Sequence, residues 1–128
     1  MRYLHTMIRV GDLDRSVDFY TRVLGFTEVR RAEYPDGEFS LVFLRAPGDV
    51  DDGPLLELTY NWGVTEYDLG SGYGHVAFQV DAMAEVQARL EAAGAAFSWG
   101  PGKTPDGRTT MAFVDDPDGY RIELLEYR

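Results

Sequence analysis

An internal repeat at an offset of 70 residues constrains this chain more than any other sequence feature. His5 recurs as His75, and these are the only two histidines among the 128 residues. The sequence therefore predicts two copies of one folding unit, which have diverged elsewhere. Further positions that match at this offset are Val10 with Val80, Pro35-Asp36-Gly37 with Pro105-Asp106-Gly107, Phe43 with Phe113 and Pro47 with Pro117.

Both copies show the same order of predicted elements. Helices are expected to begin at the N-caps Asp12 and Asp81 and to end at Gly25 and Gly94. This order predicts an α+β fold of two βαβββ repeats in curved mixed sheets, each covered on its outside by a helix. We expect a single domain over 1–128, with repeats over about 1–62 and 73–128. The predicted strands cover 3–10, 26–34, 38–45 and 55–60 in the first copy and 75–80, 95–99, 108–115 and 120–126 in the second.

Composition excludes several classes of protein. Without cysteine, the chain has no disulfide, thiolate nucleophile or cysteine-ligated metal. The net charge of −10 argues against a nucleic-acid or anionic-membrane partner, although single arginines or lysines can still hold a small anion. No apolar run has the length of a membrane span, and no apolar targeting core follows Met1. We therefore expect a soluble cytoplasmic protein.

Strand alternation places one histidine and one glutamate of each copy on the face away from the packed apolar side chains. His5 and His75 lie on the first strand of each copy, and Glu57 and Glu123 lie on the last. A carboxylate within an apolar run is unfavourable unless it is paired or binds a cation. Two neutral imidazoles and two carboxylates neutralise a divalent metal, and this ligand set suits Zn, Ni or Co. The side chains expected to pack on the helices are Leu4, Ile8 and Val10 in the first copy and Val76, Phe78 and Val80 in the second.

Each of these polar residues also has a purely structural interpretation. A single strand histidine is more often structural than a metal ligand, and each glutamate can instead pair with an arginine, such as Arg9 or Arg121. Taken singly, the residues favour the structural interpretation. Taken as a symmetric set of four, they favour a metal site.

Four segments resemble, in order, the motifs of glyoxalase I in the vicinal oxygen chelate superfamily. They lie within 5–26, 57–63, 67–78 and 116–124, and the resemblance covers nearly the whole chain. It implies one divalent metal per site, with two waters beside four protein ligands. Because a short bacterial-type chain with histidine at its first ligand position resembles the Ni/Co-activated class, Ni²⁺ is expected before Co²⁺ or Zn²⁺. The implied ligands are His5, Glu57, His75 and Glu123.

The same resemblance implies a lactoylglutathione lyase reaction that detoxifies methylglyoxal. The hemithioacetal of methylglyoxal and glutathione becomes S-lactoylglutathione when a proton moves between adjacent carbons through an ene-diolate, whose oxygens a metal stabilises. Glu123 is implied as the main general base, and Glu57 as its counterpart on the opposite face of the substrate.

Substrate contacts are implied at Arg9 and Asn61, which match family positions that contact glutathione. Arg9 also has an ordinary interpretation as a surface charge. Ser71 stands where some family members carry an arginine. Lys103 or Arg108 is therefore a candidate for the missing carboxylate contact, although their loop is equally consistent with a solvated turn.

The family is typically a homodimer whose active site spans the interface, with the first repeat of one chain facing the second repeat of the other. The sequence alone does not distinguish this arrangement from pairing within one chain. Two other functions compete with the lyase. Ring-cleaving dioxygenation or thioester epimerisation can use the same scaffold, but dioxygenation normally needs two histidines and one carboxylate on Fe(II). A metal-free antibiotic-binding module needs no such set of four ligands.

Overall fold

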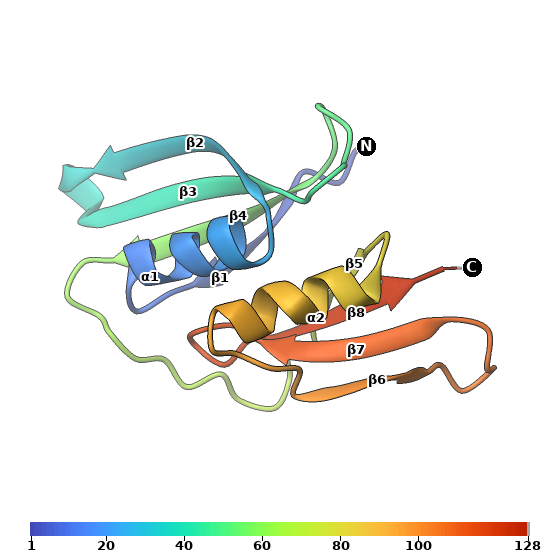
Figure 1. The fold of residues 1–128 in the computed structure, drawn as a ribbon. Helices are drawn as coiled ribbons and strands as arrows, with labels where there is room; N and C mark the ends of the chain where they lie inside the picture. The colour runs from blue at the N-terminus through green and yellow to red at the C-terminus, as the bar shows by residue number, and fades with distance from the viewer. Residues whose placement is uncertain (128) are drawn as a thin grey trace. The chain divides into compact units, whose positions relative to one another are not determined.

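A computed structural model describes residues 1–127 and divides into two compact units, Met1–Asp68 and a second that begins at Leu69. Each unit contains one four-stranded sheet and one main helix (Figure 1). The first unit comprises β1 (His5–Arg9), α1 (Leu13–Asp18), the π-helix η1 (Phe19–Val23), β2 (Thr27–Tyr34), the 3₁₀-helix η2 (Pro35–Gly37), β3 (Phe39–Arg45) and β4 (Leu55–Asn61). The second unit comprises β5 (Val76–Gln79), α2 (Met83–Ala92), β6 (Trp99–Lys103), β7 (Thr110–Asp115) and β8 (Arg121–Glu126).

The two sheets have equivalent topologies. Their strand orders are β1-β4-β3-β2 and β5-β8-β7-β6. The first strand of each unit pairs in parallel with the last, and the other neighbours are antiparallel. Both sheets are therefore mixed, which confirms the predicted pair of βαβββ repeats in an α+β fold.

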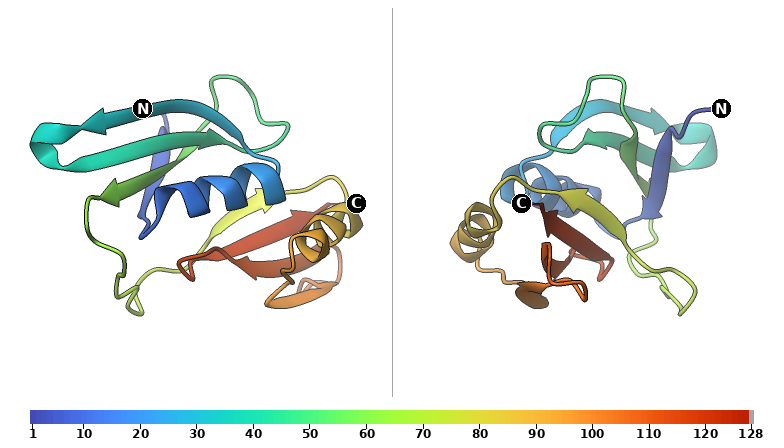
Figure 2. Two further views of the ribbon diagram at one scale, coloured as in Figure 1. Left: turned by 60° about the vertical axis from the view of Figure 1, so that its left-hand side comes forward. Right: turned by 90° about the vertical axis from the view of Figure 1, so that its right-hand side faces the viewer.

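One face of each sheet forms the apolar core of its own unit. Helix α1 packs against β4, and α2 packs against β8. Figure 2 shows each helix beside the sheet of its own unit. The prediction that Leu4 joins this core is wrong, because Leu4 precedes β1 and is 66% exposed. Side chains that are fully or almost fully buried include Ile8, Val10, Tyr20, Val42, Leu44 and Leu58 in the first unit and Met83, Leu90, Val114, Ile122 and Leu124 in the second.

The two helices begin in different ways. The carboxylate of Asp12 accepts a hydrogen bond from the Arg15 amide at 3.0 Å, which confirms the predicted N-cap of α1. The prediction that Asp81 caps α2 is wrong, because the N-cap is Ala82, whose side chain has no acceptor. Instead, the buried carboxylate of Glu126 at the end of β8 accepts from the Met83 amide at 3.1 Å.

The first helix also changes its hydrogen-bonding pattern before it ends. The amide of Leu24 donates to the carbonyl of Phe19 at 3.1 Å, which is the i to i+5 bond of a π-helix. The predicted ends of both helices are confirmed, since Gly25 and Gly94 have φ of +84° and +75°.

The predicted strand over 95–99 is displaced along the chain, because β6 begins at Trp99. Its sequence, Trp-Gly-Pro-Gly-Lys, has the composition of a loop. Pro101 is tolerated because β6 is an edge strand, where a missing amide need not break a ladder. Within residues 1–127, no helix is long and apolar enough to cross a membrane.

Candidate metal centre

The first unit brings His5 and Glu57 together, and we refer to them as the N-terminal pair. Parallel pairing of β1 with β4 sets Met7 opposite Glu57, two residues beyond His5. Because alternate strand residues share a face, the two side chains project to the same side. The Nε2 atom of His5 lies 3.1 Å from Oε1 of Glu57. The carboxylate is therefore paired with an imidazole instead of an arginine.

The second unit repeats this arrangement with His75 and Glu123, the C-terminal pair. His75 immediately precedes β5, and Glu123 lies on β8, which pairs in parallel with β5. The Nε2 atom of His75 is 2.7 Å from Oε2 of Glu123. The imidazoles of the two units are 38% and 39% exposed, whereas the carboxylates are 12% and 17% exposed. Each pair is thus a mostly shielded carboxylate beside an accessible imidazole.

A phenylalanine supports each pair from the neighbouring strand. Phe43 is the cross-strand partner of Glu57, and Phe113 is the partner of Glu123. The rings of His5 and Phe43 meet edge to face, with centroids 5.4 Å apart, and those of His75 and Phe113 do so at 5.5 Å. These contacts restrict the orientation of the imidazoles. The repeat marks both phenylalanines in the sequence, but their role emerges only from the strand register.

Two arginines lie over the same phenylalanine rings; the sequence suggests Arg121 as a partner of a glutamate, but it does not point to Arg30. The guanidinium carbon of Arg30 is 4.8 Å from the Phe43 centroid, and that of Arg121 is 5.5 Å from the Phe113 centroid. Both therefore add positive charge to the surroundings of the two carboxylates. A local sequence signal for Arg30 is absent, because a register shift after Glu28 decides which face it joins.

The two predicted substrate-binding residues lie in the first unit. Arg9 ends β1, with its side chain exposed, on the strand face that carries His5. Asn61 ends β4 on the face of Glu57, and its amide nitrogen donates to the Tyr67 hydroxyl at 3.1 Å. Tyr67 thereby fixes the amide orientation of Asn61.

The candidates for the missing carboxylate contact lie in the second unit. Lys103 ends β6, where its amine donates to the Thr110 hydroxyl at 3.1 Å. Arg108 follows in the exposed turn, where its backbone amide is bonded to the Asp106 carboxylate. Ser71 is exposed in the segment before β5. None of these contacts joins them to the C-terminal pair.

A cavity of about 330 Å³ opens beside the C-terminal pair. His75 and Arg121 line it together with Tyr73 and Tyr120, whose rings meet edge to face at 5.8 Å. Space for a small molecule thus adjoins one candidate ligand. The cavity combines an imidazole, a guanidinium and aromatic walls, which suits an anionic organic molecule.

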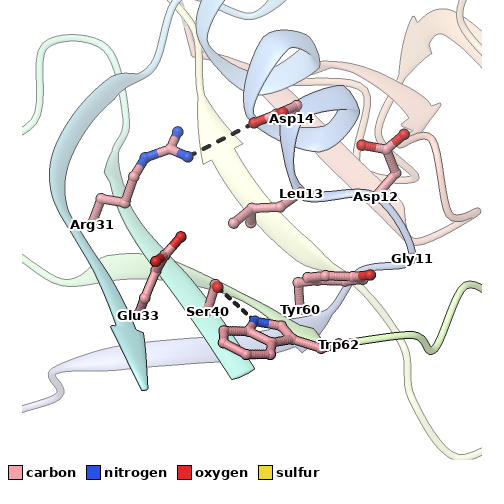
Figure 3. Close-up of a pocket in the computed structure, with 9 residues that line it drawn as sticks. All are labelled: Gly11, Asp12, Leu13, Asp14, Arg31, Glu33, Ser40, Tyr60 and Trp62. Carbon is pink, nitrogen blue, oxygen red and sulfur yellow. Dashed lines mark hydrogen bonds and ion pairs between the residues drawn. The ribbon is translucent and has the colours of Figure 1, made fainter. Parts of the chain in front are cut away.

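A second cavity, of about 530 Å³, lies in the first unit (Figure 3). Ser40 and Tyr60 line it, and by strand alternation they lie on the opposite face from Glu57. Trp62 forms part of its wall and donates from Nε1 to the Ser40 hydroxyl at 2.8 Å. Because neither histidine lines this cavity, it is separate from the N-terminal pair.

No cluster of three or more potential metal ligands exists among residues 1–127 of the structure. Each unit supplies one imidazole nitrogen and one carboxylate, which is half of the predicted set of four. The donor types fit a borderline divalent cation, for which imidazole and carboxylate are both suitable ligands. A centre with all four predicted ligands would therefore need one pair of each kind.

Comparisons with known proteins agree with this fold. The family model of the glyoxalase/bleomycin resistance protein/dioxygenase superfamily matches residues 2–124. The chain belongs to this superfamily, as its four motifs predict. A lactoylglutathione lyase from Escherichia coli O157:H7 is 48% identical over 126 residues, which is 98% of this chain and 93% of the relative.

Solved structures extend the comparison. A glyoxalase I from Leishmania major, described as trypanothione-dependent, matches with a TM-score of 0.83 and 45% identity, over 98% of this chain and 86% of its own. TnmS3, an antibiotic-binding protein from Streptomyces sp. CB03234, matches with a TM-score of 0.76 and 25% identity, over 100% and 97%. The similarity is therefore stronger to the enzymes, and the relation to glyoxalase I implies a divalent metal ion.

Proposed function

We propose that this chain is a metal-dependent lactoylglutathione lyase that converts the hemithioacetal of methylglyoxal and glutathione into S-lactoylglutathione. The observation that carries this proposal is the pairing of one histidine with one glutamate in each unit, where the first and last strands of the unit are neighbours. Similarity to lactoylglutathione lyases over nearly the full length supports it. Because glutathione is a cytosolic thiol, we infer that the protein works in the cytoplasm and removes methylglyoxal there.

The proposed metal ligands are His5, Glu57, His75 and Glu123. We infer one divalent ion per site, with Ni²⁺ as the first choice and Co²⁺ or Zn²⁺ as alternatives. When bound, the ion would act as a Lewis acid that polarises the substrate oxygens and makes the adjacent C–H bond more acidic. The edge-to-face contacts of Phe43 and Phe113 keep the imidazoles oriented before the ion arrives.

Glu123 is the proposed general base. Its carboxylate removes the proton from the carbon that carries the hydroxyl and the sulfur, and it returns this proton to the neighbouring carbonyl carbon. The hydroxyl proton moves to the oxygen of that second carbon, so no atom is gained or lost. Glu57 occupies the equivalent position in the other unit. We propose that it is the counterpart of Glu123 on the opposite face of the substrate. The shielding of Glu123, 17% exposed, favours proton return over exchange with water.

Substrate binding is assigned to Arg9 and Asn61. The chain has a net charge of −10, so an anionic thiol conjugate needs a local positive group such as Arg9. The amide of Asn61, oriented by Tyr67, offers hydrogen bonds to the peptide part of glutathione. Arg121 lines the cavity beside His75 and supplies a further cation there.

We further propose that the working form is a homodimer in which the N-terminal pair of one chain completes the site with the C-terminal pair of its partner. A mixing experiment separates this arrangement from pairing within one chain. The double variants His5→Ala/Glu57→Ala and His75→Ala/Glu123→Ala each lack one pair. Co-refolded heterodimers regain one intact site only if the pairs come from different chains. Recovery of activity supports the swapped dimer, and no recovery from folded heterodimers contradicts it.

The proposed activity is tested with preformed methylglyoxal–glutathione hemithioacetal. Metal-stripped protein should form no thioester, and addition of Ni²⁺, Co²⁺ or Zn²⁺ in separate reactions should restore activity and rank the metals. Folded protein that stays inactive with every metal contradicts the proposed substrate. The same hemithioacetal made with a different thiol then shows whether the carrier or the reaction class is wrong.

A further inference from the structure

The two His–Glu pairs differ at one position two residues beyond each glutamate. In the first unit, the hydroxyl of Thr59 donates to Oε2 of Glu57 at 2.8 Å. Glu57 and Glu123 are 66 residues apart, and the same offset aligns Thr59 with Leu125, which has no hydrogen-bonding group. The repeat is therefore chemically asymmetric at this site.

The hydrogen bond engages both oxygens of the Glu57 carboxylate. His5 lies 3.1 Å from Oε1, and Thr59 occupies Oε2. Thr59 is 7% exposed and Glu57 9% exposed, so water competes little for this bond. These two contacts together restrain rotation of the Glu57 carboxylate about its terminal bond.

Glu123 has no contact that corresponds to the one from Thr59. His75 contacts its Oε2 at 2.7 Å, and the structure of residues 1–127 shows no hydrogen bond or ion pair to its other oxygen. The neighbouring side chain at 125 is a leucine, which lies on the same strand face and cannot donate. Among the described residues, the carboxylate of Glu123 thus has one polar side-chain contact, whereas that of Glu57 has two.

We propose that Thr59 is a positioning residue that holds the Glu57 carboxylate in the orientation of a metal ligand. This inference rests on the proposed function, because it assumes that Glu57 binds a metal ion. The hydroxyl of Thr59 then acts on the metal only through Glu57, and the second unit has Leu125 in its place.

The expected loss of metal affinity follows from other proteins in which a hydrogen bond orients a metal ligand. Removing such an outer hydrogen-bonding partner costs about 10- to 100-fold in metal affinity or activity. Thr59→Val removes the donor and keeps the branched shape, whereas Thr59→Ser keeps the donor.

The test measures metal affinity without substrate, by competition of Ni²⁺ between the protein and a chelator, and then kcat and KM. Thr59→Val should weaken Ni²⁺ binding at least about tenfold, and Thr59→Ser should stay within about threefold of the unmodified protein. Thr21→Val is the control, because it removes the bond from the Thr21 hydroxyl to the Val17 carbonyl within the same unit.

Equal Ni²⁺ affinities for Thr59→Val and Thr59→Ser, on proteins with the same thermal unfolding, overturn the inference. The proposed function fails separately, if the unmodified protein binds Ni²⁺ but does not convert the hemithioacetal. In that case the affinities of the Thr59 variants still decide whether the hydroxyl positions the ligand. Unmodified protein that binds no divalent metal overturns both proposals.

Discussion

The imidazole of His75 lies 2.7 Å from the carboxylate of Glu123, although α2, β6 and β7 separate the two residues in the chain. Parallel pairing of β5 with β8 produces this contact, and the pairing of β1 with β4 produces the equivalent contact between His5 and Glu57. Each βαβββ unit thus places its first strand, at the sheet edge, beside its last strand. The pairs are a consequence of topology, which explains why they recur with the repeat.

The removal of the proposed base should abolish turnover without unfolding the protein. Glu123→Gln keeps the shape of the side chain but removes its ability to take up a proton at neutral pH, so we expect most activity to be lost. Glu91→Gln makes the same change at an exposed position of α2 and should be fully active. Turnover of the hemithioacetal and circular dichroism of both variants check this. Near-normal turnover of Glu123→Gln removes Glu123 from the mechanism.

Arg9 should contribute to substrate binding more than to the chemical step. Arg9→Ala is expected to raise KM about tenfold, because a charge-assisted hydrogen bond contributes roughly 1.5–3 kcal/mol and exposure reduces this value. Arg2→Ala, at an exposed arginine that contacts Asp52, should leave KM unchanged. Steady-state kinetics at low and moderate salt measure both effects. An unchanged KM for Arg9→Ala identifies Arg9 as an ordinary surface charge.

The fold and the His–Glu pairs are the parts that sequence reasoning predicts best. Strand alternation and the helix-ending glycines act over short distances, and the repeat can be read directly from the sequence. Alternation therefore places His5 and Glu57 on the face away from the core without knowledge of the register. Thr59 also lies on that face, but its bond to Glu57 requires side-chain geometry. The roles of Phe43 and Arg30 depend on which strands are neighbours and on a register shift, which local pattern does not encode.

The start of α2 shows where local preference misleads. Asp81 has the better capping side chain, yet the repeat offset of 70 aligns Ala82 with Asp12, and the structure follows the repeat. A carboxylate distant in sequence, Glu126, then takes over the capping role. Propensity at one residue is thus overridden by a tertiary contact.

This remote cap gives a stability prediction. Glu126→Ala leaves the Met83 amide without its acceptor and should lower the free energy of unfolding by about 1–2 kcal/mol. Adding Ala82→Asp restores a local cap like that of Asp12 and should recover part of the loss. Denaturant unfolding of the single and double variants measures both changes. Equal stability of Glu126→Ala and the unmodified protein contradicts the capping role.

A close backbone approach in the first unit gives a second stability prediction. A Cβ atom at Gly11 would lie 2.0 Å from the Thr65 carbonyl oxygen, so the chain must move to accept any side chain there. Gly11→Ala should therefore cost about 1–3 kcal/mol of stability. Gly72→Ala meets no atom within 4 Å and should be neutral or slightly stabilising. Thermal unfolding measures the stability of both variants. An unchanged stability of Gly11→Ala shows that the segment around Thr65 moves at little energetic cost.

Metal content tests the central claim, that two His–Glu pairs form one catalytic metal site, most directly. After equilibration with Ni²⁺ and removal of free ion, elemental analysis should find about one ion per chain. Alanine variants of His5, Glu57, His75 and Glu123 should each lose most of that ion, because every pair is only half of the ligand set. Two ions per chain, or full retention when either pair is removed, contradicts a single shared site.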